Sequence, residues 1–75
     1  MSKITHAGLE ISAKTADEAY QTAQKFNQDA FGGKMKAIIA DEIGQNTYWV
    51  TLAETESLAS VKHQDYLEDN GWSKL

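Results

Sequence analysis

A repeat of apolar residues at every third or fourth position marks an amphipathic helix in the first half of the chain. Its apolar positions are Ala16, Ala19, Tyr20, Ala23, Phe26 and Ala30. This spacing places them on one face of a helix, and the glutamines between them make the opposite face polar. We expect the alanines to let this helix lie close to a sheet, with Tyr20 and Phe26 as its large anchors.

The sequence also specifies both ends of this helix. Thr15-Ala16-Asp17-Glu18 has the form of a capping box, in which the Thr15 hydroxyl accepts from the amide of Glu18 and the Glu18 carboxylate reaches back to the amide of Thr15. At the other end, Gly32-Gly33 can adopt the left-handed cap conformation at little cost. The helix is therefore predicted to begin after Thr15 and to end near Phe31.

The segment before this helix has the alternation of a strand. Within residues 4–14, Leu9, Ile11 and Ala13 alternate with polar residues, which is the period of a half-buried strand. Gly8 interrupts the alternation. We therefore expect either a β-bulge at Gly8 or a frayed segment before it.

Residues 34–53 have the pattern of a β-hairpin. One parity of its first strand is apolar apart from Asp41, and it comprises Met35, Ala37, Ile39 and Ile43. In the second strand, Tyr48, Val50 and Leu52 share one parity. The residues between them, Gly44-Gln45-Asn46, tolerate the positive φ that tight hairpin turns require. Residues 47–52 are almost all β-branched or aromatic, so we expect them to form a central strand.

The last helix has a less regular pattern. One face of it is marked by the spacing of His63, Tyr66, Leu67 and Asn70. Thr55 and Ser60 are alternative caps, and residues 54–60 either belong to the helix or form a separate turn. Gly71 stands just past the predicted end, so a Schellman ending would set Trp72 against Leu67.

These elements predict an α+β fold. The chain has 75 residues, which is the size of a single compact domain covering residues 1–75. The order β-α-β-β-α predicts a two-layer fold with a small, mostly antiparallel three-stranded sheet and both helices on one face. A right-handed crossover through the first helix would make the first two strands parallel. The sequence leaves open whether the third strand lies between them or outside them.

Trp49 is the residue most indicative of a contact surface. The predicted surface comprises Trp49, Ile38, Thr47 and Thr51. If the Tyr48 parity faces the helices, Trp49 faces away from them, onto a side of the sheet that no helix covers. An exposed tryptophan beside an isoleucine is typical of an interaction hot spot. Two alternatives remain: Trp49 belongs to the core, or a second copy covers the open face.

Charge is distributed unevenly along the chain. The net charge is −4, residues 1–36 carry +1, residues 37–75 carry −5, and arginine is absent. Arginine is the preferred side chain for phosphate contacts, so direct nucleic-acid binding is not expected and another protein is the expected partner. Asp65, Glu68 and Asp69 on the last helix are candidate contacts for a basic protein surface, even as a mimic of nucleic-acid phosphates. The alternative is a solvated helix face that maintains solubility.

Signatures of catalysis, cofactors and metals are absent from the sequence. Cysteine is absent, and His63 and Asp65 are two residues apart, so on a helix they point in different directions. Gly32-Gly33-Lys34 follows a helix, whereas a phosphate-binding loop precedes one. We therefore expect no enzymatic activity, no cofactor and no metal. The chain shows no signal core and no apolar run near the ~20 residues that cross a bilayer, so a cytoplasmic location without membrane contact is expected.

The element order and the acidic last helix resemble those of the small DNA-damage-inducible inhibitors that bind the RecA recombinase. The resemblance covers the layout of the whole chain, although that family's arginines have no counterpart here. A short, acidic, cysteine-free chain is also similar in style to phage-encoded inhibitors of host defence, including anti-CRISPR proteins. With Trp49 and Ile38 as an apolar anchor and the acidic helix as a charged surface, we expect a non-enzymatic protein-binding module that inhibits or regulates a larger macromolecular complex, as these resembling proteins do. The alternative is a structural homodimer or an accessory subunit.

Overall fold

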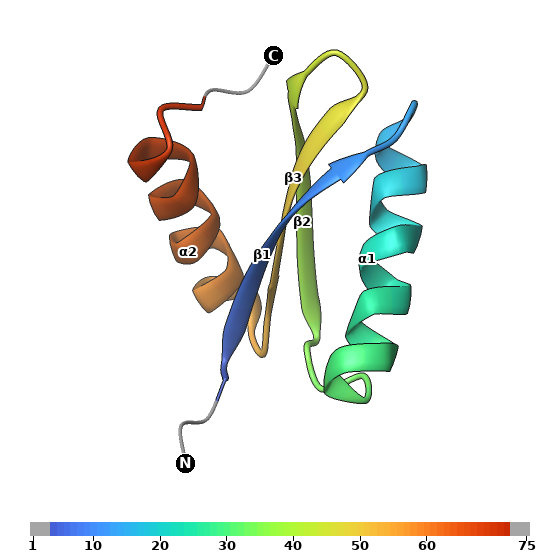
Figure 1. Cartoon of the computed structure of the whole chain (residues 1–75). Helices are drawn as coiled ribbons and strands as arrows, with labels where there is room; N and C mark the ends of the chain where they lie inside the picture. Colours follow the sequence, from blue (N-terminus) through green and yellow to red (C-terminus); the bar gives the residue numbers. More distant parts are fainter. Residues whose placement is uncertain (1–3, 73–75) are drawn as a thin grey trace.

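The computed structural model describes residues 4–72 and contains the five predicted elements in the predicted order. They are β1 (His6–Ser12), α1 (Ala16–Phe31), β2 (Ala37–Gly44), β3 (Thr47–Ala53) and α2 (Glu56–Asp69). Figure 1 shows the three strands between the two helices. The α+β class and the β-α-β-β-α order are confirmed.

β3 is the central strand of the sheet, as its β-branched and aromatic composition predicts. The strand order is β1-β3-β2, and both pairings are antiparallel. β1 and β2 therefore run parallel to each other without touching, which fits the predicted crossover and places the third strand between them. The hairpin turns at Gln45 and Asn46, and Asn46 has a φ of 54°. A register shift between Glu42 and Gly44 leaves Ile43 as the extra residue of a bulge.

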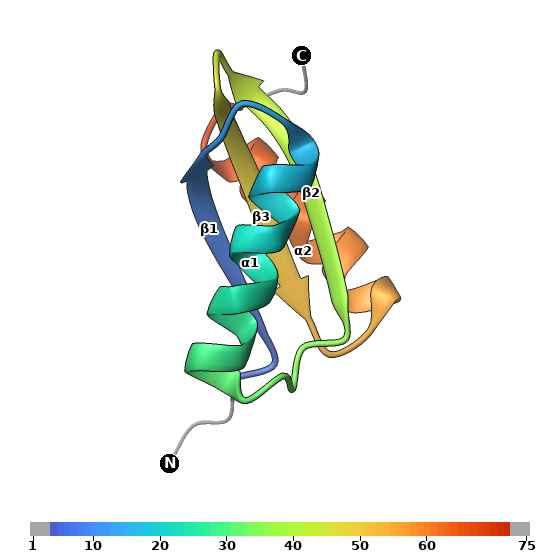
Figure 2. The same cartoon turned by 90° about the vertical axis from the view of Figure 1, so that its right-hand side faces the viewer.

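The placement of the second helix differs from the prediction. α1 packs on one face of the sheet and α2 on the other, so the fold has three layers and neither sheet face is open (Figures 1 and 2). The physical reason lies in the parity that the prediction assigned to solvent. On β3 that parity consists of Thr47, Trp49, Thr51 and Ala53, and the last two are completely buried. Both faces of β3 thus need cover, and a single helix covers only one.

The α1 face is mainly apolar and follows the predicted pattern in part, because Ala19 and Ala23 are completely buried whereas Ala16 and Ala30 are exposed. Its buried cluster comprises Ile11, Ala19, Ala23, Met35, Tyr48, Val50 and Leu52. The Glu18 amide donates to the Thr15 hydroxyl at 3.2 Å, and Gly32 closes the helix with a φ of 62°. The Glu18 carboxylate accepts from the amide of Lys14 at 3.1 Å instead of that of Thr15. The prediction that Tyr20 is a large core anchor is wrong, because this residue is 40% exposed and lies at the rim of the core.

The α2 face is lined by small, polar and aromatic residues. Ala37, Ala53 and Ala59 form its buried apolar cluster. Thr55 caps the helix by accepting from the Leu58 amide at 3.1 Å. Residues 56–60 are therefore the first turns of α2, and the separate turn considered from the sequence does not form. The Schellman ending is confirmed, since the Trp72 amide donates to the Leu67 carbonyl at 2.8 Å.

Gly8 has a different role from the predicted bulge. The β1–β3 register passes through Gly8 without a shift, and His6 and Ala7 are already paired. A Cβ atom at position 8 would lie 2.4 Å from Cζ2 of Trp49. Glycine therefore stands in this strand because the indole ring lies across it.

Candidate functional site

Trp49 lies in an aromatic cluster beneath α2 and not on an open face. Its ring centroid is 4.7 Å from that of Trp72 and 5.5 Å from that of Tyr66, which it meets edge to face. Its parity is the predicted one, opposite to Tyr48 and Val50, but α2 covers that side. The indole is half-buried, and its N–H is buried with no hydrogen-bond partner among residues 4–72. The premise that no helix covers Trp49 is therefore wrong.

The other residues of the predicted surface are not gathered around Trp49. Ile38 is paired with Leu52 and packs on the α1 cluster, on the opposite side of the sheet. Thr51 is completely buried, so a partner cannot reach it in this fold. Thr47 is half-buried beside the hairpin turn, where its hydroxyl donates to the Gln45 carbonyl at 3.1 Å. The two faces of β2 were predicted the wrong way round. Ala37, Ile39 and Asp41 face α2, so Asp41 is part of this alternation and not an exception to it.

A chain of polar side chains, fully buried at Thr51, joins two strands of the sheet to α2. The Thr51 hydroxyl lies 2.7 Å from Nδ1 of His63, and Nε2 of His63 lies 2.6 Å from Oδ2 of Asp41. A tautomer with its proton on Nε2 donates to the carboxylate and accepts from the hydroxyl. This order of hydroxyl, imidazole and carboxylate is also that of a nucleophilic triad. The Thr51 side chain is wholly buried, so no substrate can approach it, and the chain of bonds anchors α2.

The predicted acidic residues do lie together on the surface. Asp65, Glu68 and Asp69 are all exposed, and their spacing places them on one face of α2, which we call the acidic face. Glu68 accepts a hydrogen bond from Gln64 at 3.3 Å. Within the described part of the chain, none of the three carboxylates forms an ion pair. The acidic face is thus a cluster of charges that the fold itself leaves unneutralised.

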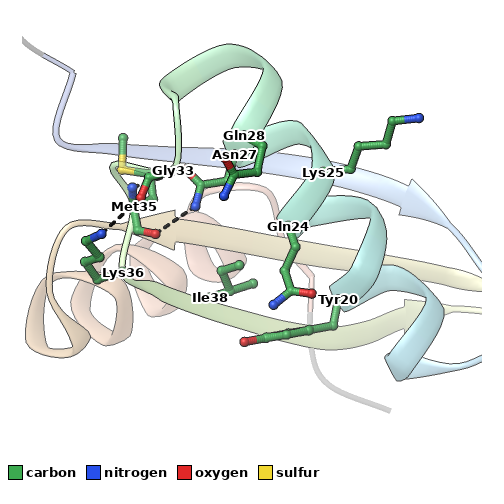
Figure 3. A pocket seen from close by; sticks show the side chains of 9 residues that line it. All are labelled: Tyr20, Gln24, Lys25, Asn27, Gln28, Gly33, Met35, Lys36 and Ile38. Carbon is green, nitrogen blue, oxygen red and sulfur yellow. Dashed lines mark hydrogen bonds between the residues drawn. The ribbon is translucent and has the colours of Figure 1, made fainter.

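A groove runs between α1 and the outer strand β2 (Figure 3). It has a volume of about 520 Å³, and Tyr20 and Gln24 from α1 face Ile38 and Lys36 across it. Asn27 closes its inner end, because its side chain donates to the Met35 carbonyl at 2.8 Å and accepts from the Met35 amide at 3.1 Å. A second hollow of about 330 Å³ continues around β2 towards Ile39 and Ser60. We call these two hollows together the edge groove.

Burial changes the acidity of one tyrosine on each side of the sheet. The pKa of Tyr48 is raised above its ordinary value by burial first, and then by the carboxylates of Glu42 and Glu18. The pKa of Tyr66 is raised by burial alone. Both hydroxyls therefore stay protonated beyond the pH at which a solvated tyrosine ionises.

Within residues 4–72, no three histidine, cysteine or acidic side chains are grouped so that they could hold a metal ion. No helix in the same range is long and apolar enough to cross a membrane. Comparison with protein-family models, with curated proteins and with solved structures finds no match to this chain.

Sequence reasoning found the acidic face but missed the residues that connect the layers. Asp41 interrupts an apolar parity and His63 lies on an apolar helix face, so each carried a signal: a polar residue at a core position needs a buried partner. Pairing the two would have placed α2 on the Asp41 side of the sheet. Asn27 carried the same signal, since it lies on the inner side of α1 beside Ala23.

Proposed function

We propose that this protein is a non-enzymatic binding module that attaches to a basic surface of another protein, as an inhibitor or regulator of a larger macromolecular complex does. The observation that carries the proposal is the acidic face: three exposed carboxylates on one side of α2 that no cation within residues 4–72 neutralises. Complementary charge of this kind accelerates association and selects partners.

The contacts that fix α2 to the sheet support the proposal. Binding costs less when the contacting groups are already held in place. The His63 bonds to Thr51 and Asp41 fix the middle of the helix, and the ring of Tyr66 contacts Trp49. The acidic face therefore presents its charges on a rigid support, in contrast to a charged tail.

The proposal is tested by neutralising two acids of the acidic face and, as a control, two exposed acids on other elements. Asp65→Asn with Asp69→Asn removes two charges from the acidic face, whereas Glu10→Gln with Asp29→Asn removes two exposed charges elsewhere. A tagged protein and both double variants are used to capture partners from lysate of the source organism, followed by mass spectrometry and binding of the purified partner at two salt concentrations. We expect the first variant to lose the partner and the second to retain it. Equal capture by both variants would contradict the proposal.

A further inference from the structure

β2 is an edge strand whose outer side is free to accept another strand. In the sheet of residues 4–72 it has a neighbour on one side only. Its eight residues, AIIADEIG, include neither lysine nor proline, the residues that commonly protect such edges. One of its two acids, Asp41, is directed inward to His63. The bulge at Ile43 interrupts the end of this edge, so residues 37–42 are the part that can act as a template for strand pairing.

The register of the sheet determines which backbone groups face outward. The Glu54 amide donates to the Thr5 carbonyl, and the β1–β3 pairing continues from there without a shift. Backbone groups of an antiparallel central strand alternate between its two neighbours, so those of Trp49, Thr51 and Ala53 face β2. Their partners in β2 are Asp41, Ile39 and Ala37. By the same alternation, the N–H and C=O groups of Ile38, Ala40 and Glu42 point away from the sheet.

We infer that the strand that pairs with this edge is β2 of a second copy, in an antiparallel arrangement whose two-fold axis passes beside Ile39. In this register Ile38 of one copy lies opposite Ala40 of the other. Their outward N–H and C=O groups then exchange two backbone hydrogen bonds. The Lys36 amide donates to the Ala53 carbonyl of β3, so pairing of outward backbone groups between the copies begins at Ile38. The Lys36 side chain, just before β2, is then close to Glu42 of the other copy, and the reciprocal pair forms by symmetry. Opposite charges at facing positions of neighbouring strands stabilise the pairing.

Neighbouring registers are less complementary. An axis beside Ile38 places Lys34 opposite Glu42, but the Lys34 ammonium already pairs with Glu54 at 3.1 Å. An axis beside Ala40 places Lys36 opposite Gly44 and Glu42 opposite Ile38. An axis beside Asp41 places the two Asp41 residues against each other, and like charges that face each other across strands are destabilising. Residues 36–42 are therefore most self-complementary in the register whose axis lies beside Ile39.

The edge groove provides apolar surface next to the same axis. Tyr20 is 40% exposed and overhangs Ile38 on the α1 side, while Ile39 is half-buried on the α2 side. Pairing of the two edges produces a continuous six-stranded sheet, with both α1 helices on one face and both α2 helices on the other. The dimer displays two acidic faces, and such bivalent display strengthens binding to a repetitive partner. This inference uses a different surface from the proposed function and does not depend on it.

The test is the mass in solution as a function of concentration, measured by light scattering and sedimentation for the wild type and for charge variants. We expect the mass to rise from that of one chain towards that of two below about 1 mM, the upper limit of weak specific association. Lys36→Glu alone and Glu42→Lys alone should each raise the dissociation constant about tenfold, since each replaces two attractive cross-strand pairs by repulsive ones. The Lys36→Glu/Glu42→Lys double variant should restore dimerisation. Lys62→Glu, which changes the charge equally on α2, should have no comparable effect.

Amide hydrogen exchange localises the interface. The outward amides of Ile38, Ala40 and Glu42 should become protected as the concentration rises, while the amides of Ile39 and Asp41 should be protected throughout. A single-chain mass at every concentration would overturn the inference. A dimer that the charge swap does not restore, or whose newly protected amides lie outside β2, would overturn it as well.

Discussion

The two faces of the sheet are buried by different chemistry. The α1 face is a mainly apolar core, in which Val50 and Leu52 are completely buried against the alanines of α1. The α2 face contains alanines, an aromatic cluster and the buried Thr51–His63 hydrogen bond. An apolar face tolerates changes that conserve volume, whereas a polar contact must keep each donor and acceptor satisfied. The α2 side is therefore held by specific partners, and the α1 side mainly by packing.

Each helix has one buried polar anchor, and the two anchors differ in kind. Asn27 on α1 binds both backbone groups of Met35, whereas His63 on α2 binds the side chains of Thr51 and Asp41. Side-chain partners can be replaced, but backbone partners remain whatever the substitution. This difference gives the comparison its sharpest test.

The largest effect is expected from removing the two anchors. His63→Leu and Asn27→Leu should each lower the free energy of unfolding by about 2–4 kcal/mol, because each leaves buried polar groups without a partner. Adding Thr51→Val to His63→Leu should cost nothing further, since it removes the hydroxyl that had lost its partner. Urea denaturation followed by circular dichroism measures all three variants. A double variant clearly less stable than His63→Leu alone would show that the Thr51 hydroxyl is stabilised by more than its bond to His63.

A smaller loss is expected from overpacking the aromatic cluster. Gly8→Ala places a methyl group 2.4 Å from the Trp49 ring and should destabilise the protein by about 1–3 kcal/mol. Gly44→Ala is the matched control, because the nearest atom to its new Cβ, in Thr47, is at an ordinary 3.8 Å. Trp49→Phe should recover much of the loss in the Gly8→Ala background by making room. Thermal unfolding of the set measures this, and equal melting temperatures for the two alanine variants would refute it.

The smallest effect concerns the response to alkaline pH, with one tyrosine on each face as the probe. The folded-state pKa values of Tyr48 and Tyr66 both lie above the ordinary value of 10.0. Above about pH 10 the unfolded chain therefore loses these protons first, and stability falls as the pH rises; below that pH neither residue makes the stability depend on pH. Glu42→Gln should lower the pKa of Tyr48 and leave that of Tyr66 unchanged. Tyrosinate absorbance of Tyr48→Phe and Tyr66→Phe variants assigns each transition, and a Glu42→Gln effect on both tyrosines would contradict the electrostatic cause.

The sequence predicted the local features well because short-range rules govern them. Thr15 starts α1 and Gly32 ends it, Asn46 lies in the hairpin turn, and Gly71 follows the end of α2, each through contacts within a few residues. The central position of β3 also followed from its composition. The acidic face was predictable because exposed helix positions need no tertiary partner. The start of α2 was less certain, since Thr55 and Ser60 both qualify as a cap by residue type.

The sequence by itself thus determined which elements form, where α1 begins and ends, and which charges α2 exposes. Only the tertiary structure decided which side of the sheet α2 covers. That choice depends on long-range partners: the Asp41 carboxylate and the Thr51 hydroxyl, on two different strands, meet His63 through a single imidazole. It also decided that Trp49 lies against Gly8 and Tyr66 beneath α2. Alternation along a strand separates its two faces, but it does not state which face a distant helix covers, because that depends on contacts between residues far apart in the chain.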